Sequence, residues 1–82
     1  MKKILYFTAS WCQPCKSFAP IMEQVSQTVK VEKIDVDALP NIASAYNIRS
    51  VPTVVILSGN TEVSRFTGAR PAQSVLEAVN NA

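Results

Sequence analysis

The apolar residues of this chain fall into short blocks, and the spacing within each block predicts one kind of element. Ile4-Leu5-Tyr6-Phe7 is a continuous apolar run, so Lys3 to Thr8 is predicted to form a strand buried on both faces. From about Gln13 to Thr28, apolar side chains recur every three or four residues, which predicts a helix with one buried face. That face consists of Cys15, Phe18, Met22, Val25 and Val29, widened by Ile21. Pro14 falls in the first turn, where a missing N–H costs nothing, whereas Pro20 lies inside the pattern and is expected to kink the helix.

The next segments carry weaker signals for a strand and a short helix. Val31 to Val36 mixes apolar and charged residues in a way typical of a strand near the edge of a sheet. A short helix from about Pro40 to Tyr46 is expected to follow, with Asp37 available before it. Asn47 is suited to the left-handed conformation at its end.

The last third of the chain predicts a hairpin and a helix. Thr53 to Leu57 is rich in β-branched residues, Ser58-Gly59-Asn60 has turn chemistry, and Thr61 to Thr67 is the returning arm. Pro71 marks the start of a final helix whose inward residues are Val75, Leu76 and Val79.

Together these elements predict a single α/β domain over residues 1–82 in the order βαβαββα. Two strands joined by a helix are parallel with a right-handed crossover, and a hairpin is antiparallel. The expected architecture is therefore a mixed four-stranded sheet with helices on both faces. Its core should include the aromatic residues Phe7, Phe18 and Phe66.

Composition and charge exclude several classes of protein. The chain has 82 residues and is 48% hydrophobic, which is enough for one domain with an ordinary core. Its net charge is only +2 and its Lys and Arg residues are scattered, which argues against a nucleic-acid binder. No apolar stretch has the length of a membrane span. Met1-Lys2-Lys3 before an apolar run resembles a signal peptide, but the run is shorter than the roughly 7–15 residues required. We therefore expect an untargeted, cytoplasmic monomer.

The two cysteines, Cys12 and Cys15, occupy the predicted junction between the first strand and the first helix. A Cys-X-X-Cys pair at this position places the first sulfur over a helix N-terminus, where partial positive charge favours the thiolate that attacks disulfides. We predict that Cys12 is the exposed nucleophile and that Cys15, in the first turn, is the more buried resolving thiol. A structural staple is the alternative, but a four-residue loop stabilises by only about 2 kcal/mol, against about 3 for fifteen residues. Zinc needs four ligands, and this chain has two cysteines and no histidine, so only ligation shared between two copies of the chain would remain possible. We expect no metal or cofactor.

Several motifs together resemble the thioredoxin family across nearly the whole chain. Trp11-Cys12-Gln13-Pro14-Cys15-Lys16 resembles the family's Trp-Cys-Gly-Pro-Cys-Lys, with Gln13 in place of glycine. Phe18-Ala19-Pro20, Val51-Pro52-Thr53 and Gly68-Ala69 follow at fitting separations, as do Lys33, Arg49 and Gly59. The resemblance implies a thioredoxin fold without the usual N-terminal strand and helix, which gives a chain of glutaredoxin-like size. A glutaredoxin's acidic pair after the last strand's glycine is not present, since Ala69-Arg70 follows Gly68.

The resemblance also implies roles for the remaining site residues. Pro52 would follow a cis bond packed against the disulfide, with the backbone of Val51 pairing with substrate, although Pro52 also suits the start of a strand. Gln13 and Pro14 would set the redox poise. Trp11 belongs either to the core or to an apolar docking surface, and Lys33 is either a solvated charge or a residue that tunes the Cys15 thiolate. Tyr6 stands where thioredoxins bury an aspartate, and a phenol, protonated at neutral pH, replaces such a base poorly.

The leading function is a protein-disulfide reductase that receives electrons from a thioredoxin reductase or a similar flavin enzyme. A glutaredoxin-like donor dedicated to one reductive enzyme is the close alternative. A metallochaperone also uses Cys-X-X-Cys before a helix, but it requires a different element order. A non-catalytic binding module is the third class, and retention of both cysteines with Val51-Pro52 argues against it.

Overall fold

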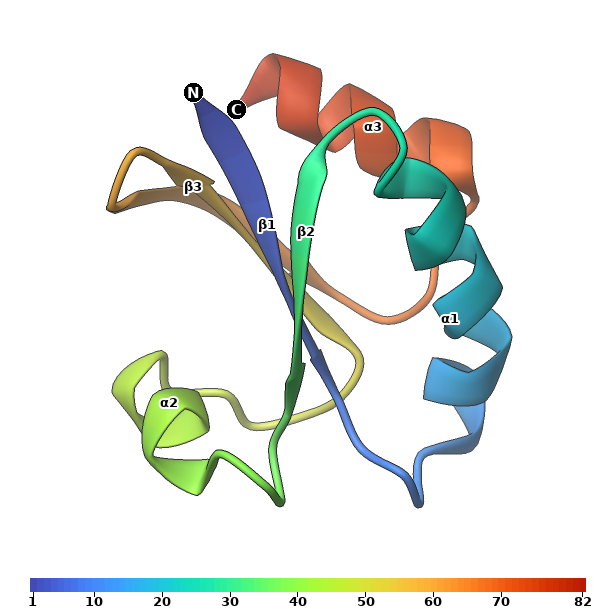
Figure 1. The fold of residues 1–82 in the computed structure, drawn as a ribbon, viewed down its shortest axis with the longest axis vertical. Coiled ribbons are helices and arrows are strands. Elements are labelled where there is room, and N and C mark those ends of the chain that lie inside the picture. The colour runs from blue at the N-terminus through green and yellow to red at the C-terminus, as the bar shows by residue number, and fades with distance from the viewer.

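The computed structural model describes residues 1–82, and its elements follow the predicted order (Figure 1). They are β1 (Lys2–Thr8), α1 (Gln13–Val25), β2 (Lys30–Asp35), α2 (Pro40–Ala45), β3 (Thr53–Ser58), β4 (Thr61–Thr67) and α3 (Ala72–Asn81). None of the three helices has both the length and the apolar character that a membrane crossing requires.

The four strands form one mixed sheet in the order β2-β1-β3-β4. β1 pairs with β2 in parallel, whereas the β1–β3 and β3–β4 pairs are antiparallel, as predicted. β2 lies at one edge of the sheet, which confirms the edge position expected from its mixed polar and apolar sequence. β4 forms the other edge.

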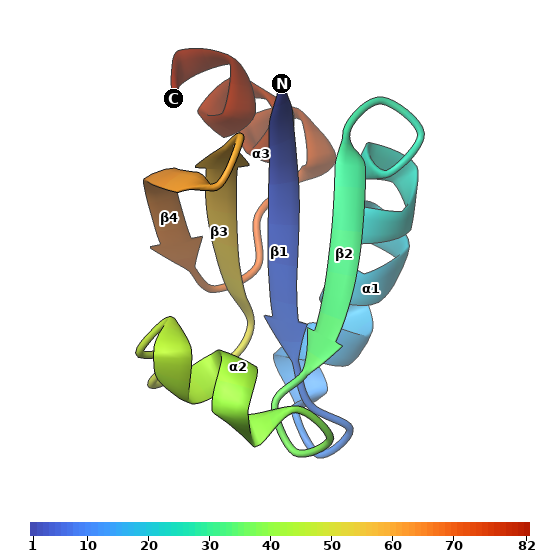
Figure 2. The ribbon, with the colours of Figure 1, turned by 60° about the vertical axis from the view of Figure 1, so that its left-hand side comes forward.

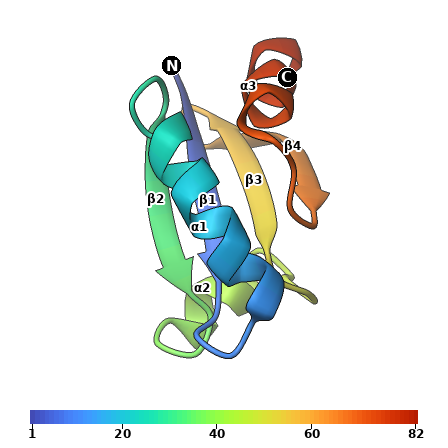
Figure 3. The same cartoon turned by 90° about the vertical axis from the view of Figure 1, so that its right-hand side faces the viewer.

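Helices cover both faces of this sheet and divide the core into two layers. Figures 2 and 3 show α1 and α3 on one face and α2 on the other. Successive residues of a strand point to opposite faces, so the apolar run of β1 supplies both layers. Ile4 and Tyr6 pack with residues of α1 and α3, whereas Leu5 and Phe7 pack with Ala43 of α2. The prediction of a strand buried on both faces is therefore confirmed. Phe7, Phe18 and Phe66 are buried as expected.

Most element ends lie within one residue of the prediction, and the main differences lie at the end of α1 and before α2. α1 ends at Val25 rather than Thr28, and Val29 packs against the core from beyond the helix. Pro20 lies within α1 without dividing it into two helices. Asp37 does not cap α2, whose N-cap is Leu39 without a side-chain hydrogen bond. The turn before α2 depends instead on Asp35, whose Oδ1 accepts from the main-chain N–H groups of Asp37 at 2.8 Å and Ala38 at 3.3 Å.

Asn47 takes the left-handed conformation after α2, with φ of 56°, as the sequence predicted. Asparagine tolerates this region better than most residues because its short polar side chain bonds locally. The turn redirects the chain toward β3 and so places the segment 48–52 beside the end of β1.

The directions of the strands bring four loops to one edge of the sheet. This edge is formed by the ends of the strands and not by the outer strands β2 and β4. β1, β2 and β4 all end at this edge and β3 begins there, which Figure 2 shows at the bottom of the molecule. Segments 9–12, 36–39, 48–52 and 68–71 therefore converge, and both cysteines lie among them. The hairpin turn and both chain ends lie at the opposite edge.

Candidate active site

Cys12 and Cys15 are joined by a disulfide, with their Cα atoms 5.2 Å apart. Cys12 is the N-cap residue of α1 and Cys15 falls in its first turn, so the predicted strand-to-helix junction is confirmed. Gln13 and Pro14 lie between them and are exposed. We call the edge of the sheet that carries this bond the disulfide edge.

The helix N-terminus supplies hydrogen-bond donors to this site. The main-chain N–H of Cys15 donates to Sγ of Cys12 at 3.2 Å, in the position where a capping side chain normally accepts. N–H groups of a first turn have no partner within the helix, and they carry its partial positive charge. A thiolate formed at Cys12 on reduction would accept this hydrogen bond and would lie next to the partial positive charge of the helix N-terminus.

Both cysteines are nearly buried in the oxidised protein. Cys12 is 4% exposed and Cys15 is 2% exposed, so the expectation of an exposed Cys12 is wrong for this state. The sulfurs form a small apolar cluster with Ala9, against which Val36 and Val51 also pack. These neighbours come from separate loops, and the spacing of the cysteines alone could not reveal them.

The segment before β3 lies directly against the disulfide. The carbonyl oxygen of Val51 is 3.6 Å from Sγ of Cys12, a contact without a shared proton while that sulfur is disulfide-bonded. The Val51–Pro52 peptide bond is cis and Pro52 is buried. Gly68 donates its N–H to the carbonyl oxygen of Pro52 at 2.9 Å. Its φ of 86° suits glycine and strains other residues, which explains a glycine at the end of β4.

Trp11 lies on the surface beside the disulfide and not in the core. Its side chain is 67% exposed, and its indole Nε1 donates to Oδ2 of Asp37 at 2.8 Å. A hollow of about 120 Å³ adjoins it, lined by Trp11, Val36, Ile48, Arg49, Ser50 and Val51. Asp37 is thus a site residue that the sequence reading missed, because its partner lies 26 positions earlier in the chain.

A second hollow, of about 310 Å³, opens on Cys15 between α1 and β2. Its lining residues are Thr8, Ala9, Ser10, Cys15, Lys16, Ala19, Lys33 and Asp35. The parallel register pairs Tyr6 with Lys33 and Thr8 with Asp35, so all four residues lie on the face that α1 covers. Lys33 therefore shares a hollow with the second cysteine.

Tyr6 lies beneath Cys15 with its hydroxyl already bonded. The hydroxyl is 3.2 Å from the carbonyl oxygen of Cys15 and 3.4 Å from Oγ1 of Thr8. A carbonyl oxygen only accepts hydrogen bonds, so the Tyr6 hydroxyl donates its proton to the Cys15 carbonyl oxygen. The Thr8 hydroxyl then donates its own proton to the Tyr6 oxygen. The ring packs edge-on against Phe18, with centroids 5.6 Å apart. Tyr6 is only 2% exposed and serves the core as well as the site.

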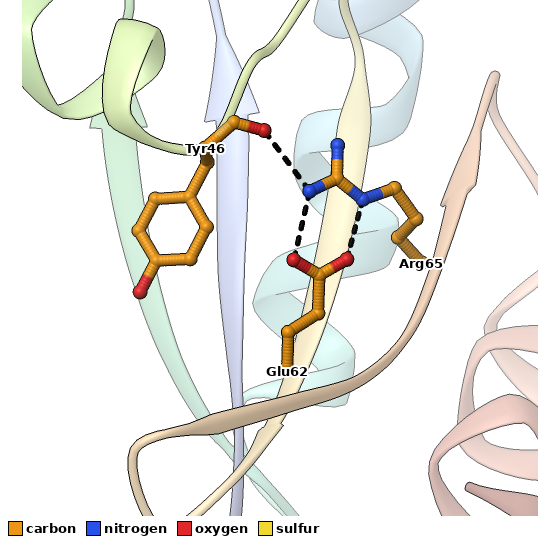
Figure 4. A network of polar contacts seen from close by, with 3 residues as sticks. All are labelled: Tyr46, Glu62 and Arg65. Carbon is orange, nitrogen blue, oxygen red and sulfur yellow. Dashed lines mark hydrogen bonds and ion pairs between the residues drawn. The ribbon is translucent and has the colours of Figure 1, made fainter.

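Glu62 and Arg65 form an ion pair on β4, away from the disulfide. Arg65 donates to both carboxylate oxygens of Glu62 and to the carbonyl oxygen of Tyr46 (Figure 4). The hydrogen bonds from Arg65, opposed by partial burial and aided by charge attraction, lower the pKa of Glu62. The same contacts raise the pKa of Arg65. Nowhere do three or more His, Cys, Asp or Glu side chains gather as metal ligands.

The chain matches known proteins over almost its full length. The family profile described as "Thioredoxin" matches residues 1–81. A thioredoxin from Synechocystis is 45% identical over 69 residues, covering 79% of this chain and 64% of the relative. Thioredoxin Y2 of Arabidopsis thaliana is 38% identical over 79 residues, covering 92% of this chain and 47% of the relative. The chain thus spans about half to two thirds of the length of these relatives.

Solved structures share the same arrangement of elements. A mutant thioredoxin from Halobacterium salinarum superposes with a TM-score of 0.92 at 30% identity, covering 98% of this chain and 73% of that one. The thioredoxin of Fasciola hepatica superposes with a TM-score of 0.90 at 31% identity, covering 98% of this chain and 79% of that one.

Proposed function

Since the chain belongs to the thioredoxin family, we propose that it is a thiol–disulfide oxidoreductase that reduces protein disulfides through a reversible Cys12–Cys15 couple. One observation carries this proposal above the others. The cysteine pair closes a disulfide at a helix N-terminus, directly beside the carbonyl oxygen of Val51. A disulfide that served only to stabilise the fold would gain nothing from the helix N-terminus or from the Val51 carbonyl oxygen.

The first step uses Cys12. Its thiolate attacks one sulfur of the substrate disulfide, forming a mixed disulfide and releasing the other substrate sulfur as a thiolate that takes a proton from water. The N–H of Cys15 stabilises the attacking thiolate through the bond that it already donates to Sγ. Cys12 is therefore assigned as the nucleophile.

The second step uses Cys15. Its thiolate attacks Sγ of Cys12, closes the Cys12–Cys15 disulfide and expels the second substrate thiolate, so that two electrons have passed to the substrate. Because the Tyr6 hydroxyl is bonded to a carbonyl, we assign proton loss from Cys15 to water in the hollow lined by Lys33. The nearby ammonium of Lys33 favours the thiolate.

Docking is assigned to the surface around Trp11 and Val51. The exposed indole and the adjoining hollow provide an apolar contact. Val51 precedes β3, and its main-chain groups pair with an extended substrate segment in this proposal. Gln13 and Pro14 set the redox poise, and Gly68 holds the loop at Pro52 through its N–H.

The partners are disulfide-containing proteins and a thioredoxin reductase or similar electron source. The protein acts as a monomer in the cytoplasm, where a reducing poise regenerates the dithiol.

Insulin reduction driven by dithiothreitol tests the activity. We expect turnover by the wild type and none by Cys12→Ser or Cys15→Ser, which serve as matched controls. Repeating the assay with NADPH and a thioredoxin reductase, or with glutathione and its reductase, identifies the electron source. Regeneration by glutathione alone would reassign the protein as a glutaredoxin-like donor. Absence of turnover under all conditions would leave a binding module and refute the proposal.

A further inference from the structure

The net charge of this chain is concentrated around the disulfide. The chain has eight Lys and Arg residues and six Asp and Glu residues. Four of the cations, and only two of the carboxylates, lie in the hollows and loops of the disulfide edge. These residues are Lys16, Lys33, Arg49, Arg70, Asp35 and Asp37. The other four cations and four carboxylates balance, so the whole excess of two positive charges surrounds the active site.

Neither carboxylate at this edge is paired with a cation. Oδ1 of Asp35 accepts from two main-chain N–H groups, and Oδ2 of Asp37 accepts from the Trp11 indole. The ion pairs of the chain are Lys3–Glu32 and Arg65–Glu62, both away from the disulfide. The four cations of the disulfide edge are therefore without an internal carboxylate partner.

Two of these cations, Arg49 and Arg70, belong to the segments 48–52 and 68–71, which the hydrogen bond from Gly68 to Pro52 joins. Arg49 lines the hollow formed with Trp11 and Val51. Arg70 follows Gly68, whose N–H bonds to Pro52, and its guanidinium lies 4.0 Å from the centre of the Phe66 ring. Stacking on the buried Phe66 ring holds this guanidinium in place while the Arg70 side chain remains exposed. A guanidinium binds a carboxylate with two parallel hydrogen bonds, which gives direction as well as attraction.

We propose, on the basis of the function assigned above, that the preferred substrates carry Asp or Glu side chains beside their reducible disulfide. The occupant of the docking surface is then an extended, acidic protein segment. Arg49 and Arg70 attract its carboxylates while Trp11 and Val51 hold its backbone and apolar side chains. Attraction of this kind acts mainly on the association rate, and salt screens it.

Three synthetic peptides test the proposal. Each contains the same internal disulfide, flanked by two Glu, two Gln or two Lys residues. The protein is reduced, freed of dithiothreitol and mixed with each peptide, and the second-order rate constant of peptide reduction is measured. At low ionic strength we expect the Glu peptide to react about tenfold or more faster than the Lys peptide. At 0.5 M NaCl, where the screening length is only a few ångströms, the ratio should fall toward one.

A pair of double variants shows where the preference originates. Arg49→Gln with Arg70→Gln should remove most of the advantage of the Glu peptide. Lys3→Gln with Lys30→Gln changes the net charge equally at the opposite edge and should retain the advantage. Lys16 is left unchanged because it adjoins Cys15, where its removal would disturb the thiols.

The outcomes separate this inference from the proposed function. Equal rates for the Glu and Lys peptides at low salt, or an equal loss of preference in both double variants, would overturn the inference alone. Failure to reduce even the Gln peptide would refute the proposed activity, and the substrate preference with it.

Discussion

The Tyr6 hydroxyl donates a hydrogen bond to the main-chain carbonyl oxygen of Cys15, 3.2 Å away. Thioredoxins commonly bury a carboxylate at this position, and a carboxylate can accept the proton of the second cysteine. The phenol is instead committed to the backbone, with Thr8 as its other neighbour. We therefore expect Tyr6 to hold the main chain of Cys15 in place and to take no proton from its thiol.

Tyr6→Phe should leave insulin reduction within a small factor of the wild type, because the hydroxyl is bonded to a main-chain carbonyl oxygen and not to a sulfur. It should lower the free energy of unfolding by about 1 kcal/mol, the usual worth of one hydrogen bond. Urea unfolding and the pH–rate profile measure the two effects. A loss of activity of two or more orders of magnitude would mean that the hydroxyl is catalytic.

Cys15→Ser should accumulate a mixed disulfide between Cys12 and an oxidised protein substrate. Without the second thiol, nothing expels the substrate from Sγ of Cys12. Mass spectrometry after incubation with oxidised substrate detects the adduct. Cys12→Ser is the matched control and should form none, and trapping through Cys15 would reverse the roles of the two thiols.

Asp37→Ala should weaken docking without weakening the fold. The bond from Trp11 Nε1 to Asp37 holds an exposed indole in one orientation, and its loss frees the ring. We expect KM for a protein substrate to rise several-fold with kcat nearly unchanged, and the free energy of unfolding to shift by less than about 0.5 kcal/mol. Glu77→Ala removes an exposed carboxylate from α3 and serves as the control. Equal KM values for the two variants would refute this role.

Glu62 should make a small contribution to stability that depends on pH. Its folded pKa lies below the unfolded value, about 4.3, because Arg65 donates hydrogen bonds to its carboxylate. The contribution is therefore complete above the unfolded pKa and is lost as the pH falls through the folded pKa. For a partly exposed pair it amounts to about 0.2–1 kcal/mol.

Glu62→Gln isolates this contribution, because it leaves the bond from Arg65 to the carbonyl oxygen of Tyr46 available. The difference in unfolding free energy between wild type and variant should be largest near pH 7 and should shrink steadily below about pH 4. Urea unfolding at a series of pH values measures it. A difference independent of pH would show that the charge of Glu62 contributes nothing.

The local elements of this fold were predictable because each has a local cause. The apolar run of β1, the periodicity of α1 and the turn residue Asn47 all act through near neighbours in sequence. The end of α1 was not predictable, since Ser26 to Thr28 carry no stop signal and Val29 continues the apolar spacing of the helix. Val29 instead reaches the core from a turn.

The site was predictable where the chemistry lies within a motif, and not where it depends on contacts between loops. The Cys12–Cys15 pair lies within one short motif, and its place at the start of α1 followed from the apolar run of β1 and the periodicity of α1. The burial of Cys12 depends on Ala9, Val36 and Val51. The orientation of the Trp11 indole depends on its hydrogen bond to Asp37. These residues meet only because three strands end, and one begins, at the same edge of the sheet.

The open edges of the sheet bear on how the molecule behaves in concentrated solution. β2 and β4 each have one side without a strand partner, and such edges invite strand addition by neighbouring copies and then aggregation. Both strands carry charges: Lys30, Glu32 and Lys33 on β2, and Glu62 and Arg65 on β4. A copy that docked edge to edge would have to strip water from these groups. We therefore expect the charged side chains of β2 and β4 to oppose edge-to-edge pairing between copies, even in concentrated solution.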